Sequence, residues 1–187
     1  KDSMDNKRLA LYKIQIGRVL LKNNKFDESK KIFEDSLNVY PDLHICYYFL
    51  GQIFANESNF IYDKAINLED NANGSLNDSN ESQQLKIEAE KVLSQAIPMW
   101  GHFIENMPEY SWMILPTLKD ALQALHRYDD IEKMLISTRN KNQDNIDVLS
   151  HLADFYANKG EIDKAITTIN KALDKNKYSL IGRLKRL

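Results

Sequence analysis

The 187-residue sequence is poor in the residues that define several classes of protein. Its single cysteine, Cys46, excludes an internal disulfide framework and any four-cysteine metal site, and it indicates a reducing compartment. Six glycines and four prolines leave few points where a helix must stop, which favours long helices. The formal charge of -2 provides no general attraction for nucleic acid. The longest run without a charged residue, 43–56, is shorter than the stretch of about 20 apolar residues that spans a membrane.

The sequence also lacks the patterns that mark catalytic and metal sites. No two of its four histidines are three or four residues apart, so no single helix is expected to present two metal ligands. Cys46 lies in the apolar run ICYYFL, where a buried and inert thiol is expected. The stretch 69–74 is only faintly similar to a calcium loop, because Asn80 stands where the twelfth-position glutamate is needed. We therefore predict a non-enzymatic protein without cofactor or metal; the rival hypothesis is catalysis near His102 and Glu105.

What the sequence does contain is a repeat with a period of about 34 residues. The clearest unit begins at Ile146, which we number as position 1 of the repeat. It has apolar or small residues at positions 4, 7, 8, 11, 20, 24 and 27, and Gly160 at position 15. Gly160 lies one period after His126, and Gly51 lies one period after Gly17. The large apolar residues have helical spacing, and the small residues allow two helices to approach closely. A glycine at position 15 can adopt positive φ in a turn, so each unit is predicted to be two antiparallel helices.

Two segments resemble tetratricopeptide repeats: GRVLLKNNKFDESKKIFEDSLNVYP (17–41) and LADFYANKGEIDKAITTINKAL (152–173). The first carries the glycine, phenylalanine and proline positions of the family, and the second its Leu, Ala, Tyr, Gly, Ala and Ala positions. The third unit departs from the pattern because Lys119 replaces the small residue at position 8. The resemblance implies an all-α fold, a right-handed superhelix of antiparallel helix pairs with about four repeats in one domain over 1–187.

One part of this repeat array is expected to be interrupted. The predicted repeats lie near 10–43, 44–105, 110–145 and 146–178, and 179–187 is predicted to start a further helix. Because 69–84 has four acidic residues, no basic residue and little to bury, we predict a mobile loop insert over about 58–84. Two segments compete for the second helix of repeat two, 61–69 and 85–100; the latter has the longer apolar stripe and is favoured. The aromatic stretch 97–116 is interpreted as core packing rather than an exposed binding cluster.

The family resemblance also implies a binding surface. In tetratricopeptide proteins the first helices line a concave groove that holds an extended peptide or a partner helix, so we expect a scaffold that binds a protein or peptide partner. Carried over by position, the groove residues are Ile14, Arg18, Lys22, Tyr48, Gln52, Asn56, Asp120, Gln123, Asp154 and Asn158. This wall is basic at one end and acidic at the other. Ile14 occupies the lysine position of the family's carboxylate clamp, which argues against a chaperone tail as partner.

Two alternatives remain open at this point. The C-terminal segments MILPTLKDALQALHRYDDIEKML, IDVLSHLADFY and NKYSLIGRLKRL are similar to the bacterial lipopolysaccharide assembly protein B family. Those proteins are membrane-anchored adaptors that bring an envelope-biosynthesis enzyme to a membrane protease, so the resemblance implies the repeat portion of such an adaptor. The other alternative is a structural protein that forms homo-oligomers through the ends of its repeat stack. The expected location is the cytoplasm, with or without a membrane tether outside these residues.

Overall fold

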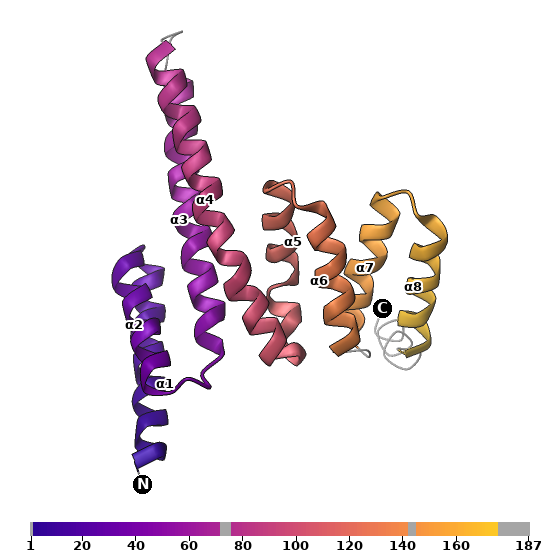
Figure 1. The fold of residues 1–187 in the computed structure, drawn as a ribbon, viewed down its shortest axis with the longest axis horizontal. Coiled ribbons are helices and arrows are strands. Elements are labelled where there is room, and N and C mark those ends of the chain that lie inside the picture. Colours follow the sequence, from indigo (N-terminus) through magenta and orange to yellow (C-terminus); the bar gives the residue numbers. More distant parts are fainter. Residues whose placement is uncertain (1, 72–75, 142–144, 176–187) are drawn as a thin grey trace, which may run out of the picture. The chain divides into compact units, whose positions relative to one another are not determined.

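The computed structural model describes residues 2–71, 76–141 and 145–175, and every regular element in these ranges is helical. In chain order they are α1 (Asp2–Lys22), α2 (Phe26–Val39), α3 (Ile45–Asn71), α4 (Leu76–Asn106), the 3₁₀ helix η1 (Pro108–Met113), α5 (Leu115–Ala124), α6 (Tyr128–Lys141), α7 (Ile146–Asn158) and α8 (Ile162–Lys175) (Figure 1). This confirms the all-α prediction. The chain divides into two compact units, Lys1–Asn106 and Met107–Leu187, and the prediction of one domain over 1–187 stays a prediction.

In the first unit, α1 and α2 form a close-packed pair around the predicted small residue. A Cβ atom placed on Gly17 would lie 2.8 Å from Cζ of the buried Phe33, so only glycine fits without a shift of that ring. The Ser29 hydroxyl donates a buried hydrogen bond of 2.8 Å to the Gly17 carbonyl. The connecting turn contains Asn24 at φ 57°, at repeat position 15. Helix α2 ends at Val39, two residues before the proline that was expected to stop it.

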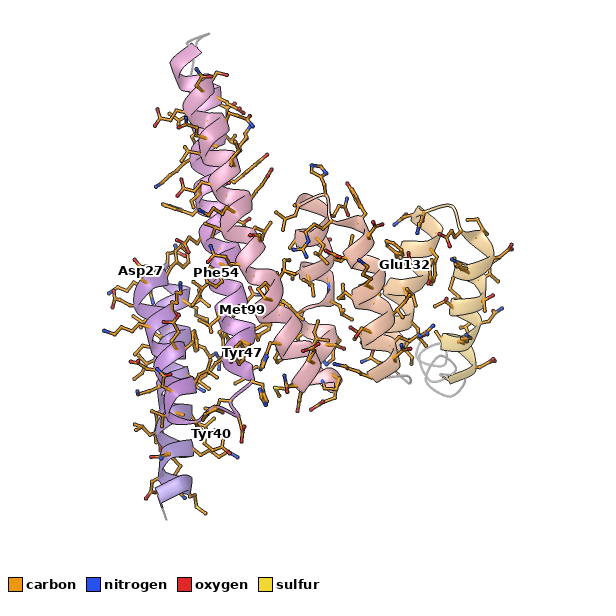
Figure 2. All side chains as sticks on the ribbon, in the orientation of Figure 1. Asp27, Tyr40, Tyr47, Phe54, Met99 and Glu132 are labelled. Atoms are coloured by element: carbon orange, nitrogen blue, oxygen red, sulfur yellow. The ribbon has the colours of Figure 1, made fainter. Side chains whose placement is uncertain are left out.

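Helix α2 also covers one face of α3. Phe33 lies in a buried cluster with Cys46, Leu50 and Ile53 of α3, and other apolar residues of α2 pack against this cluster. Lys30 of α2 lies over the Phe54 ring of α3, 4.7 Å from its centroid (Figure 2 labels Phe54). The contact between α2 and α3 is thus an apolar seam with a cation–π contact beside it.

The predicted loop insert over 58–84 is wrong, because the described parts of this stretch, 58–71 and 76–84, are helical. Helices α3 and α4 pack along one another and run past the end of α2 (Figure 1). Small buried residues recur every seven positions, at Ser58 and Ala65 on α3 and at Ser82 and Ala89 on α4. The Ser58 hydroxyl donates to the Ala89 carbonyl at 2.7 Å. Two helices with polar outer surfaces can pack through this narrow row of small residues, which we call the α3–α4 seam. An acidic and Asn-rich composition therefore does not require a loop.

The favoured second helix of repeat two, 85–100, lies in α4 and packs on the first half of α3. Trp100 is fully buried, and its indole Nε1 donates to the Tyr48 carbonyl at 3.3 Å. It lies directly against Gly51, the small residue of this repeat. The aromatic stretch 97–116 is therefore only partly core, because Trp100 and Phe103 are buried whereas Tyr110 and Trp112 are exposed.

In the second unit, α5, α6, α7 and α8 pack in sequence order. The α5–α6 turn contains His126 at φ 55° and the α7–α8 turn contains Gly160 at φ 79°, which confirms the predicted turn position. The buried residues include Leu118, Leu135 and Leu152. The predicted further helix over 179–187 lies outside the described residues.

Candidate functional site

The predicted groove residues of the first unit are not all available to a partner. Ile14 is buried in the cluster that contains Phe33, so the prediction that it lines a groove is wrong. The reason is that α1 turns the stripe of Ala10, Ile14 and Gly17 toward α2. The other predicted residues of this unit are exposed or half-buried, and they stay predictions: Arg18, Lys22, Tyr48, Gln52 and Asn56.

In the second unit, two predicted groove residues line one cavity. Gln123 of α5 and Asn158 of α7 are both exposed and border a cavity of about 540 Å³. Its remaining lining residues come from α5, α6, α7 and the turn after α7: Lys119, Tyr128, Asp129, Ile131, Phe155 and Lys159. The other two predicted residues, Asp120 and Asp154, are exposed but do not line this cavity. The cavity is the candidate functional site.

The cavity lies where the repeat pattern is broken. Position 8 of the other repeats holds Gly17, Gly51 or Ala153, all of which are buried. In the third repeat this position holds Lys119, whose side chain is long and half-buried. Accordingly, α5 packs less extensively on α6 than α1 does on α2 or α7 does on α8. The long side chain of Lys119, in place of a small one, keeps α5 and α6 from packing closely, and this accounts for the cavity beside it.

The sequence comparison agrees with this repeat geometry. A family model described as tetratricopeptide repeat matches residues 11–43 and 146–176, which hold α1–α2 and α7–α8. Residues 11–43 and 146–176 are thus similar to tetratricopeptide repeats. A search of curated proteins finds no significant match, so the resemblance to lipopolysaccharide assembly protein B stays a prediction.

Several solved tetratricopeptide structures align over most of the chain at low identity. A MamA structure (MSR-1 C2) has 17% identity and a TM-score of 0.48, covering 89% of this chain and 76% of that one. YrrB, described as a TPR protein with an unusual peptide-binding site, has 15% identity and a TM-score of 0.36, covering 95% and 92%. TTC0263 of Thermus thermophilus has 18% identity and a TM-score of 0.37, covering 94% and 96%.

The turn between the two helices of repeat three places an aromatic ring at the cavity. Because His126 takes a left-handed conformation, the chain reverses and α6 begins at Tyr128, which is half exposed. Arg127 and Asp130 fix this turn through an ion pair of 2.7 Å, and hydrogen bonds, first from Arg127, hold the pKa of Asp130 below its usual value. Phe155 of α7 supplies a second ring to the lining.

The charges at the cavity divide into a paired and an unpaired part. Lys159 contacts Glu132 at 2.9 Å and Glu161 at 3.2 Å, and these hydrogen bonds, first that to Glu132, raise the pKa of Lys159 (Figure 2 labels Glu132). Lys164 and then Lys159 lower the pKa of Glu161 by hydrogen bonding, so this network stays charged at neutral pH. Lys119 and Asp129, by contrast, make no ion pair with any described residue, which leaves one ammonium group and one carboxylate unpaired at the cavity.

One pairing of residues was missed because it joins distant parts of the sequence. The rings of His44 and His102 lie 5.5 Å apart, and the ring of Tyr47, which Figure 2 labels, lies 3.9 Å from that of His102. Spacing within one helix gives no sign of this pair, because His44 directly precedes α3 and His102 lies near the end of α4. In the described ranges, the two histidines are not joined by a third side chain of the kind that ligates metals.

Proposed function

We propose that the chain is a non-enzymatic adaptor that binds a peptide segment at the cavity between α5, α6 and α7. The observation that supports this proposal is that Gln123 and Asn158, which come from first helices of two successive repeats, border the same cavity. Tetratricopeptide repeats serve as protein-interaction modules, and adjoining first helices form their usual binding wall.

The chemistry of the lining suits an extended peptide with an apolar side chain and an acidic group. The side-chain amides of Gln123 and Asn158 each offer donors and an acceptor to a peptide backbone. The Tyr128 and Phe155 rings provide apolar area for a side chain. The free ammonium group of Lys119 favours a ligand carboxylate, because that charge has no partner within the described residues.

The test is selection of binding peptides and measurement of their affinity for matched variants. A random peptide-display library is selected on immobilised protein, and the recovered peptides are titrated by fluorescence anisotropy. Gln123→Ala with Asn158→Ala removes amide hydrogen bonds worth about 0.5–1.5 kcal/mol each, so affinity should fall about tenfold or more. The control, Gln84→Ala with Asn170→Ala, removes two exposed amides away from the cavity and should leave affinity unchanged.

Two results would contradict the proposal. One is a library that yields no peptide with measurable affinity. The other is an equal loss of affinity in the cavity variant and the control, which would place binding elsewhere. Lys119→Glu provides an independent check, because reversal of the free charge should weaken acidic peptides and spare neutral ones.

Two further statements about this chain are also proposals: that it is located in the cytoplasm, and that a segment outside these residues tethers it to a membrane. None of the helices in the described part of the chain combines the length and the apolarity that a bilayer crossing requires. A role in lipopolysaccharide assembly rests on sequence resemblance alone.

A further inference from the structure

The first helix exposes an apolar face that is buried in later repeats. This α1 face consists of Tyr12, Ile16 and Val19, each at least 53% exposed. One period later, the same positions are Cys46, Leu50 and Ile53 of α3, each at most 4% exposed. In α3 these residues are covered by α2, whereas no described helix covers the equivalent face of α1, which packs on α2 with its opposite side. The α1 face therefore has the composition of a helix-docking surface that no described helix covers.

The last described helix exposes the matching half of the same interface. This α8 face consists of Ile162, Ile169 and Leu173, which are 44–54% exposed. Four periods earlier, the same positions are Phe26, Phe33 and Leu37 of α2. Those three residues form or border the cluster that buries Cys46, Leu50 and Ile53. The α8 face is thus the repeat equivalent of the surface that covers α3.

We propose that the α8 face of one molecule docks on the α1 face of a second copy, repeating the α2–α3 interface between molecules. Both halves of the interface are present in each chain, and both are exposed. The contact joins two different surfaces, so each pair keeps one free α1 face and one free α8 face, and further copies add until the assembly closes into a ring or extends as an open chain.

The residues beside the two faces favour this pairing. In the α2–α3 interface, Lys30 lies over the Phe54 ring. The equivalent residues at the exposed faces are Ile166, which is 51% exposed, and Leu20, so the intermolecular contact is apolar where the internal one is charged.

A symmetric pairing of two α1 faces is less favourable. Helix α1 carries five lysines or arginines against two aspartates, so two copies of it face to face would repel each other. Helix α8 carries Asp163 and Asp174 beside three lysines, so α1 meets a smaller net positive charge on α8 than on a second copy of α1. The pairing of α1 with α8 therefore rests on the apolar match and involves less charge repulsion than the symmetric pairing.

The experiment uses one blocked variant for each face and their mixture. Ile16→Asp blocks the α1 face, Ile169→Asp blocks the α8 face, and Ile87→Asp places the same charge on an exposed isoleucine outside both faces. Sedimentation velocity and light scattering across concentrations give the mass of each. The unaltered chain and Ile87→Asp should grow beyond a dimer, whereas each blocked variant alone should stay monomeric, with association weakened about 30-fold or more. An equimolar mixture of the two blocked variants should form a dimer and stop there.

The mixture makes the result decisive. If Ile169→Asp alone still forms dimers, the α1 faces pair with each other and the proposal is overturned. It is also overturned if the unaltered chain stays monomeric at the highest concentration reached, or if the mixture stays monomeric. Circular dichroism confirms that each variant is folded, and where an aspartate variant is not, Ile16→Ser or Ile169→Ser replaces it in the same scheme.

Discussion

The contact between Gly51 and Trp100 gives a quantitative test of the packing in the first unit. Gly51→Ala would place a Cβ atom against the Trp100 indole, which is fully buried. Overpacking of this kind costs about 1–3 kcal/mol. Displacement of the indole from the Tyr48 carbonyl removes a hydrogen bond worth about 1 kcal/mol. Alanine recovers about 0.5–1 kcal/mol of helix propensity, so the net loss of stability should be about 1–3 kcal/mol.

Gly101→Ala is the matched control, because Gly101 lies in α4 and nothing stands within 4 Å of the position that its Cβ atom would occupy. That substitution should therefore stabilise the helix by about 0.5–1 kcal/mol. Urea unfolding followed by far-UV circular dichroism and tryptophan fluorescence measures both variants. A Gly51→Ala protein as stable as Gly101→Ala would refute the close approach of α3 and α4 at this point.

Three single side chains, Cys46, Asn145 and Ser58, provide further tests. Burial raises the pKa of Cys46 from 9.0 to about 12, so its thiolate fraction near neutral pH falls about a thousandfold and maleimide should label it only after unfolding. The same pKa shift stabilises the fold below pH 9, and this stabilisation is lost between pH 9 and about 12. Cys46→Ala should therefore flatten the pH dependence of the free energy of unfolding in that range. Asn145 accepts from the Val148 N–H at 3.2 Å and caps α7; Asn145→Ala should cost about 1 kcal/mol in thermal unfolding, with Asn145→Asp as the neutral comparison. Ser58→Ala removes the buried bond to Ala89 and should cost about 1 kcal/mol, with faster amide exchange in the outer part of the α3–α4 hairpin.

The fold class could be predicted from the sequence because each repeat position has a physical reason for the type of residue that it holds. Position 8 is small where helices approach closely, as at Gly17 and Gly51, and position 15 has positive φ at Gly160. The period also located two residues of the candidate site, Gln123 and Asn158. These predictions depend only on local spacing, which a sequence displays directly.

What the sequence did not reveal depends on contacts between distant residues. Composition over 58–84 suggested a loop, since the small residues that form the α3–α4 seam look unremarkable until two helices are placed together. Tyr128 and Phe155 were missed as site residues because they lie outside the positions that the family uses for its groove. Ile14 was assigned to the groove by position alone, although the inward stripe of α1 includes it.

The departures from the period are as informative as the matches. At position 15 of repeat two, Ser58 replaces a turn residue, and α3 continues where the other repeats reverse direction. At position 8 of repeat three, Lys119 replaces a small residue, and a cavity lies beside it. At the α1 and α8 faces the pattern is kept but the neighbouring helix is missing from the described structure. Each departure thus has a local structural consequence: Ser58 packs in the seam of a longer hairpin, Lys119 borders a cavity, and the two terminal faces stay exposed.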